Sequence, residues 1–208
     1  MNKILLLLTM CVGVYAQDTE LMNQFLVQYN ATSSTMVTGY FRTRINVSQD
    51  AGQFMQVKPG LILDHALTKN KHLFLQGGYY NQSTLNSDHE TYTNLHRIFG
   101  GPRWIFLEKN NNRLETRMLF EQFYTPSGTS VFSRSRDRVM WEYINHKYIP
   151  SASYEYLRSL GVNYNRFNWM IRKQVNPNTQ TGIGFEFRQM PDGRYHRIIW
   201  TNVIYKIK

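Results

Sequence analysis

The chain has 208 residues, with 24 Lys and Arg against 14 Asp and Glu, one cysteine, and 42% hydrophobic and 14% aromatic residues. This length suits one domain, and the hydrophobic and aromatic content argues against intrinsic disorder. The sequence has no run of about 18 apolar residues, which excludes a helical membrane protein, and a single cysteine excludes a disulfide scaffold.

The N-terminus has the pattern of a cleavable signal peptide. A short positively charged start is followed by an apolar run at 4–14, and small residues precede a cleavage point after Ala16. We therefore predict a signal peptide at 1–16 and one domain at 17–208, which would lose Cys11 and carry a net charge of +9. A lipoprotein signal ending at Cys11 is disfavoured because Met10 is too bulky for that motif.

After the signal, apolar and polar residues alternate with period two, which predicts strands throughout. Strands are predicted at 21–30, 35–47, 54–67, 72–82, 92–108, 113–125, 134–148, 151–158, 165–175, 180–190 and 195–207. The segments between them are short and contain no helical crossover, so an all-β, antiparallel up-and-down β-barrel is expected. Bacterial single-chain barrels have an even strand number, so we expect ten or twelve, with 148–164 as the doubtful stretch. Glycines at 77–78 and 100–101 fall inside strands and indicate a bulge or a close backbone approach.

Each predicted strand has an apolar face and a polar face. On 35–47, for example, Val37, Phe41 and Ile45 oppose Arg42 and Arg44. This pattern fits a soluble, lipocalin-like periplasmic barrel around an apolar ligand, and it equally fits an outer-membrane barrel with apolar residues toward lipid. Nearly all arginines lie within strands while lysines lie more often at turns, and guanidinium groups suit a crowded lumen. We therefore favour an outer-membrane barrel of a Gram-negative bacterium.

The polar faces define a candidate charge network in the barrel lumen. Its residues are Arg42, Arg44, Arg113, Glu115, Arg117, Glu121, Arg134, Arg136, Arg138, Glu142, Arg166, Arg172, Glu186 and Arg188. The network predicts either a narrow, anion-selective channel or a structural plug of salt bridges that fills a small barrel. The excess of arginine also suggests contact with phosphate groups of outer-membrane lipid, including lipopolysaccharide, through Arg134, Arg136 and Arg138. Other envelope proteins are further candidate partners, and nucleic acid is not expected for an exported chain.

Short motifs at 40–44, 113–117, 134–138, 165–167 and 203–207 recur in one pattern. With them the chain resembles the family of exported bacterial proteins catalogued as domain of unknown function 2490. The resemblance implies an outer-membrane β-barrel without an established activity, and it carries over no functional residues.

Catalysis and metal binding have weaker signals. An outer-membrane lipid-modifying enzyme would need a Ser or Asp beside a His, and only the segment 87–90, which holds Ser87, Asp88 and His89, has these types together. Polar residues are expected in such a loop in any case. The histidines show no zinc-type spacing, so we predict no metal, cofactor or catalytic residue, and the enzyme stays an alternative.

Overall fold

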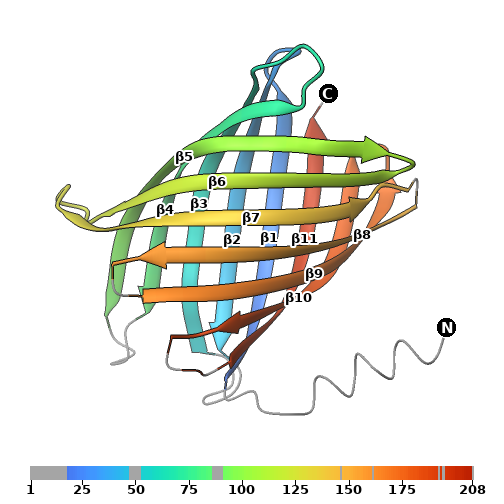
Figure 1. The fold of residues 1–208 in the computed structure, drawn as a ribbon. Coiled ribbons are helices and arrows are strands. Elements are labelled where there is room, and N and C mark those ends of the chain that lie inside the picture. Colours follow the sequence, from blue (N-terminus) through green and yellow to red (C-terminus); the bar gives the residue numbers. More distant parts are fainter. Residues whose placement is uncertain are drawn as a thin grey trace.

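A computed structural model of the protein describes residues 18–46, 53–85, 91–145, 147–160, 162–191, 193 and 195–207. In this part of the chain eleven strands form a closed barrel (Figure 1). The strands are β1 Asp18–Asn30, β2 Thr35–Asn46, β3 Gln53–Ala66, β4 Leu73–Leu85, β5 Tyr92–Lys109, β6 Asn112–Tyr124, β7 Ser130–Tyr143, β8 Tyr148–Ser159, β9 Val162–Asn176, β10 Thr179–Gln189 and β11 Tyr195–Ile207. Among the described residues no helix is long and apolar enough to cross a membrane. The predicted signal peptide at 1–16 lies outside the described residues.

Consecutive strands pair antiparallel, and the sheet closes between β1 and β11 (Figure 1). The all-β barrel class is therefore confirmed. The closing pair is parallel, with a register that runs from Asp18 opposite His196 to Tyr29 opposite Ile207. An even strand number is required only where all neighbours run antiparallel. The parallel seam explains why the described chain closes with eleven strands, between the ten and twelve that we expected.

We call the end of the barrel with the β6–β7 turn at 125–129 the proximal end, and the end with the β5–β6 turn the distal end. Asn110 and Asn111 make the latter turn, with φ angles of 50° and 65°. Asparagine tolerates this left-handed conformation better than other non-glycine residues, and the paired positive φ values suit the twist of a tight hairpin.

The structure corrects the expected boundaries around the doubtful stretch. β7 begins and ends earlier than the predicted 134–148, because it pairs with β6 from Tyr143 opposite Asn112 to Ser130 opposite Tyr124. The chain then turns, and β8 begins at Tyr148. Pro150 lies in the part of β8 that pairs with β9 alone, where the absence of its N–H removes no bond to β7.

β5 runs without interruption through its glycine pair. A side chain at Gly101 would collide with the carbonyl oxygen of Met118 on β6, so glycine is needed for the close approach of these two backbones. The β5–β6 register is the same on both sides of the glycines, from Gly100 opposite Phe120 to Arg103 opposite Arg117, and it shifts only further along, between Ile105 and Leu107. The glycines thus mark a close approach, as the sequence predicts.

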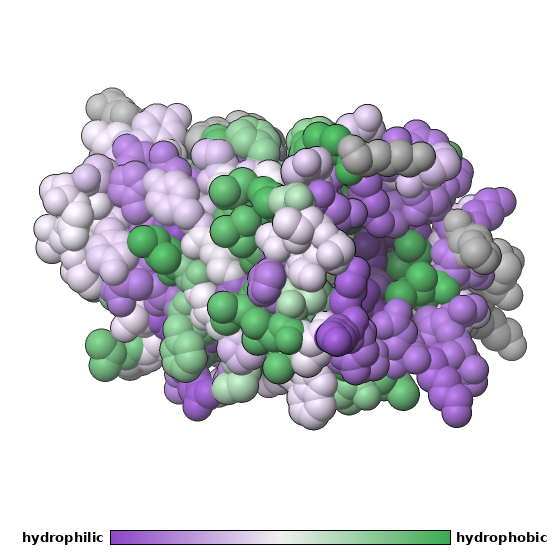
Figure 2. Space-filling view, turned by 90° about the horizontal axis from the view of Figure 1, so that it is seen from above, coloured by the Kyte–Doolittle hydropathy of each residue, from purple (hydrophilic) through white to green (hydrophobic). Residues whose placement is uncertain are grey.

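The two faces of the sheet differ sharply in chemistry. Large apolar side chains point outward, and Phe120 is 67% exposed and Ile98 54% exposed. Acidic side chains point inward, and Glu115 and Glu121 are each 2% exposed. Figure 2 shows hydrophobic residues gathered across the middle of one side of the molecule, with hydrophilic residues more frequent toward its two flanks. The interior is therefore charged, and the expectation of a lipocalin-like barrel around an apolar ligand is not supported.

A small apolar cluster also occupies the interior. It consists of Tyr80, Phe99 and Leu119, with Tyr40 and Ile62 packed against it. The rings of Tyr80 and Phe99 stack with centroids 5.1 Å apart, and Tyr40 meets Tyr80 edge-on. Side chains at Gly60 and Gly78 would collide with these rings, so the two glycines leave the space that the rings fill. The cluster narrows the lumen on the β2–β6 side of the barrel.

Candidate functional site

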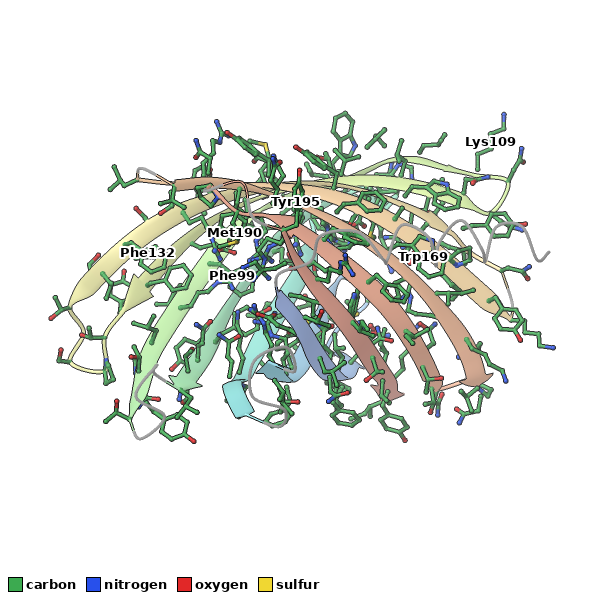
Figure 3. All side chains as sticks on the ribbon, turned by 90° about the horizontal axis from the view of Figure 1, so that it is seen from below. Phe99, Lys109, Phe132, Trp169, Met190 and Tyr195 are labelled. Atoms are coloured by element: carbon green, nitrogen blue, oxygen red, sulfur yellow. The ribbon has the colours of Figure 1, made fainter. Side chains whose placement is uncertain are left out.

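All fourteen residues of the predicted charge network lie on the interior side of the barrel wall, where strand alternation brings the polar faces of most strands together. Figure 3 shows side-chain nitrogen atoms gathered inside the closed sheet. Of the fourteen, thirteen take part in ion pairs with other described residues and Arg42 does not. The ion pairs group around a few buried carboxylates.

Glu121 on β6 is the most heavily shared carboxylate near the proximal end. It pairs with Arg97, with Arg134 through Nε at 2.7 Å, and with Arg136 at 2.9 Å. Arg134 also donates from Nη1 to the hydroxyl oxygen of Tyr164 at 2.7 Å. The Glu121 side chain is fully buried, so three guanidinium groups share one desolvated negative charge, and Arg136 also lies 4.0 Å from Glu155.

Glu115 has the same role toward the distal end. Arg138 lies 2.7 Å from one of its carboxylate oxygens, Arg103 lies 3.1 Å from the other, and Arg113 lies at 3.8 Å. Arg103 also pairs with Asp64 on β3 at 3.3 Å. The chain of ion pairs therefore runs from β3 through β5 and β6 to β7.

Two further carboxylates complete the middle of the network. Glu155 on β8 lies 3.3 Å from Arg117 and 3.7 Å from Arg166. Glu186 on β10 lies 3.6 Å from Arg166 and 2.6 Å from Arg188. Arg166 lies on β9, the strand between β8 and β10, and its ion pairs therefore link these two neighbours. Such sharing satisfies several cations with few acids and holds the interior side chains in place.

Six charged residues of the interior are missing from the prediction. They are Glu20, Lys58, Asp64, Arg97, Arg103 and Glu155. Glu20 pairs with Arg44, and a separate pair joins Arg172 to Glu142. Each missed residue follows the period-two pattern of its strand. On β3 and β5, however, the interior face also carries Ile62 and Phe99, which hide the alternation in sequence.

Cations outnumber acids inside the barrel. The described interior holds thirteen cationic side chains, Arg42, Arg44, Lys58, Arg97, Arg103, Arg113, Arg117, Arg134, Arg136, Arg138, Arg166, Arg172 and Arg188. It holds seven acidic side chains, Glu20, Asp64, Glu115, Glu121, Glu142, Glu155 and Glu186. The lumen therefore has a positive potential, and the low-dielectric wall strengthens it.

Cavities lie inside the barrel at three levels of its described part. The one near the proximal end, of about 230 Å³, is called the cationic cavity here. Its lining includes the cations Arg42, Arg44, Lys58, Arg97, Arg134, Arg136, Arg166 and Arg188, and no acidic residue among those that the structure describes. A central cavity of about 270 Å³ shares several lining residues with it, including Arg42 and Arg136. A distal cavity of about 220 Å³ lies beside Asp64 and Arg103.

The passage from the central to the distal cavity is filled by polar side chains. Gln76 donates to Asp64 at 2.9 Å and accepts from Arg117 at 3.1 Å. Arg103 pairs with Asp64 and with Glu115 at the same level. This layer of ion pairs and hydrogen bonds is the narrowing between the two cavities.

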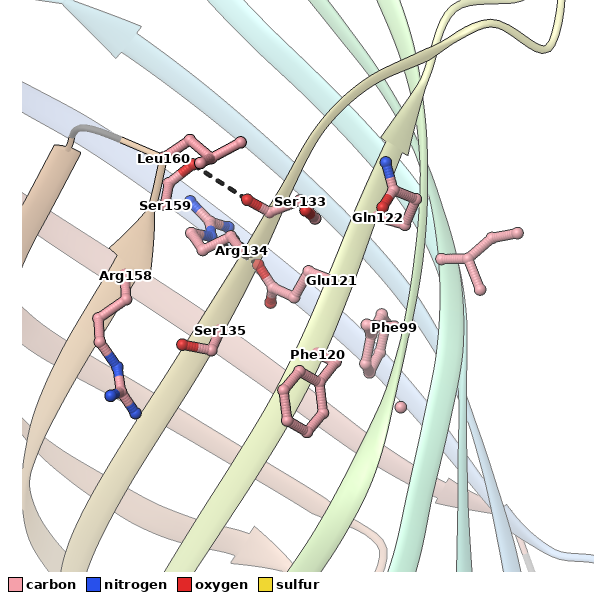
Figure 4. Close-up of a pocket in the computed structure, with 12 residues that line it drawn as sticks. Phe99, Phe120, Glu121, Gln122, Ser133, Arg134, Ser135, Arg158, Ser159 and Leu160 are labelled. Atoms are coloured by element: carbon pink, nitrogen blue, oxygen red, sulfur yellow. Dashed lines mark hydrogen bonds and ion pairs between the residues drawn. The ribbon is translucent and has the colours of Figure 1, made fainter.

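A groove of about 870 Å³ also lies on the outer wall across β5 to β8 (Figure 4). Phe120 and Leu160 border it, and the Ser159 hydroxyl donates to the Ser133 carbonyl at 3.0 Å. Beside it Arg158 pairs with Asp137 at 2.7 Å on the outer face. The described lining of this groove includes Ser133, Ser135 and Ser159 but no histidine.

The other candidate chemistry rests largely on residues outside the described part of the chain. The segment 87–90 with Ser87, Asp88 and His89 lies outside the described residues, as does His146. His65 bonds to the Thr35 hydroxyl at 2.8 Å. No cluster of three or more His, Cys, Asp or Glu that could hold a metal ion occurs in the described part of the chain.

The expected lipid contact through three arginines does not fit their position. Arg134, Arg136 and Arg138 point into the interior, with side chains 11%, 13% and 19% exposed, and each pairs with a carboxylate. This position does not favour contact with lipid outside the barrel. Contact of the protein with lipopolysaccharide stays a prediction.

Comparison with known proteins supports the fold. No protein-family model matches the chain, and no curated protein matches it. The chain is similar to a solved structure described as "NanC porin structure in rhombohedral crystal form", with a TM-score of 0.52 and 10% identity over 90% of this chain and 99% of that chain. At this identity the likeness concerns the barrel fold alone. The family resemblance of the short motifs stays a prediction.

Proposed function

We propose that the protein is a narrow, anion-selective channel of the outer membrane. The observation that supports this most is the charge of the interior, where thirteen cationic side chains face seven acidic ones. An apolar outer wall suits contact with lipid, and similarity to a porin structure agrees with a membrane-spanning barrel.

The arrangement of the charges bears on selectivity. The cationic cavity is lined by guanidinium groups and by no described carboxylate, while Glu121 and Glu155 pair with Arg136 and Arg166 of its lining. An anion entering from the proximal end would meet hydrogen-bond donors and positive charge. A cation would meet repulsion with little compensation, because the acids already bind arginines.

The size of the cavities limits what could pass. Ion pairs and the apolar ring cluster of Tyr80 and Phe99 occupy much of the lumen, and the layer around Asp64 and Arg117 narrows it further. We therefore expect small ions at low conductance, in contrast to the aqueous channel of wide porins.

The test is a planar-bilayer measurement on the refolded protein in a potassium chloride gradient. We expect small single-channel steps and a reversal potential of the sign given by chloride permeation. Arg42→Gln should lower the anion preference, because Arg42 lines two cavities and makes no ion pair with a described residue. Arg158→Gln removes the same charge from the outer face and should leave selectivity unchanged.

Three results would contradict the proposal. A reversal potential of the opposite sign would mean that the interior charge does not control permeation. A folded, membrane-inserted protein without any conductance would instead support a structural role, in which the ion pairs plug the barrel. Recovery of the protein without detergent would contradict the membrane location, and heat-modifiable gel mobility together with membrane fractionation measures this.

A further inference from the structure

Several like-charged side chains stand directly opposite each other inside the barrel. The registers place Arg117 opposite Arg138, Arg166 opposite Arg188, and Arg42 opposite Lys58. Directly opposed like charges on paired strands are destabilising unless something lies between them. We therefore looked for the negative charge that balances each of these cation pairs.

Two of these pairs have an internal counterion. Glu186 lies 2.6 Å from Arg188 and 3.6 Å from Arg166, so one carboxylate serves both members. Arg138 binds Glu115 and Arg117 binds Glu155. The chain thus supplies acid at each of these points.

The pair of Arg42 and Lys58 has none. Lys58 is 3% exposed, and no carboxylate of a described residue lies within 4.0 Å of its ammonium group or of the Arg42 guanidinium. Its ammonium lies 4.3 Å from the centre of the Tyr80 ring. Among the described residues Arg42 donates only to the neutral amide oxygen of Gln56, at 2.7 Å, and its buried Nε has no partner there. Two desolvated cations side by side are destabilising, and an anion between them would hold both in the charged form.

The space beside them is suited to one. Both residues line the cationic cavity, whose volume of about 230 Å³ admits a small oxyanion. Tyr164, on the same lining, accepts hydrogen bonds from Arg134 at 2.7 Å and Arg166 at 3.1 Å. Its own hydroxyl proton is therefore available as a donor toward the cavity.

We infer that Arg42 and Lys58 form the centre of a binding site for a small multivalent oxyanion of the phosphate type, taken from solution through the proximal end. The bound anion replaces the missing carboxylate between the two strands. The inference rests on the proposed function only for the route of entry, since binding itself requires no conduction. The interior position excludes a lipid headgroup that remains in the bilayer, so the ligand is a free ion.

The test compares thermal unfolding midpoints of the folded barrel in detergent, with inorganic phosphate and with chloride at equal ionic strength. For the unchanged protein, phosphate at about ten times its Kd should raise the midpoint by about 3–6 °C beyond chloride. Lys58→Gln should abolish this rise. Lys69→Gln, which removes the same charge from an exposed turn at the distal end, should keep it.

A second variant tests the site even if Lys58→Gln fails to fold. Gln56→Glu places a carboxylate within reach of Arg42 at unchanged side-chain size. It should raise the midpoint without phosphate and remove the response to phosphate, because the counterion is then built in. An equal phosphate response in the unchanged protein, Lys58→Gln and Gln56→Glu would overturn the site. The absence of any phosphate response would do the same.

The two proposals can fail separately. Anion-selective conductance without phosphate stabilisation would refute the oxyanion site and leave the channel. Phosphate stabilisation lost in Lys58→Gln, in a protein without conductance, would support the site and refute the channel.

Discussion

Neutralising Glu121 is the sharpest test of the interior network. Glu121→Gln keeps the shape of the side chain and removes the one negative charge that three arginines share. Removing one partner of a buried ion pair costs about 3–5 kcal/mol, because the other charge stays desolvated. Arg134 and Arg136 keep 11% and 13% of their side-chain exposure, so water relieves part of the cost. We expect a loss of about 3 kcal/mol.

For a chain of this length that loss corresponds to a midpoint lower by about 6–12 °C. The assay is thermal unfolding in detergent, read from the heat-modifiable gel shift and from circular dichroism. Glu108→Gln changes an exposed acid at the end of β5 and should move the midpoint little. Adding Arg134→Gln to Glu121→Gln should restore some stability, since one uncompensated cation disappears. A double variant that is clearly less stable than Glu121→Gln alone would show that the uncompensated positive charge does not cause the loss of stability.

Two further variants test the outer wall and the packing of the interior. Met118→Arg, at the middle of β6 and 47% exposed, should cost about 2–4 kcal/mol in vesicles, whereas Leu160→Arg near the proximal rim should cost about 0–1 kcal/mol. Equal costs from urea titration would mean that Met118 does not face lipid. Gly60→Val should destabilise by about 1–3 kcal/mol or more, because its side chain collides with Tyr80, whereas Gly39→Ala meets nothing closer than 3.8 Å and should be neutral in the same titration.

The strand pattern and the division into an apolar and a charged face could be predicted from sequence, because both follow from a side-chain period of two. Arg134, Arg136 and Arg138 stand on one face by spacing alone, and the structure places them on the interior side. The choice between lipid-facing and ligand-facing apolar residues could not be made this way, because both barrels share the pattern.

The sequence did not predict the Lys58 part of the site, for a different reason. Lys58 lies on a strand whose interior face also carries Gly60 and Ile62, so it does not stand out as part of a charged row. Its importance comes from its neighbour across the strand pair, and the register of β2 against β3 depends on tertiary structure. The lack of a carboxylate beside Arg42 is likewise a property of three-dimensional neighbours.

The parallel joint between β1 and β11 has a consequence for engineering the chain. Both strands begin at the proximal end, so Asp18 and Ile207 lie at opposite ends of the barrel. A thirteen-residue strand spans roughly 40 Å at about 3.3 Å per residue. A circular permutant could not join its old ends with a tight turn, and its linker would need about twelve extended residues to cross the barrel's height. In the membrane-spanning arrangement proposed above, epitopes at Asp18 and at Ile207 would lie on opposite faces of a vesicle membrane, so the orientation of insertion could be read directly.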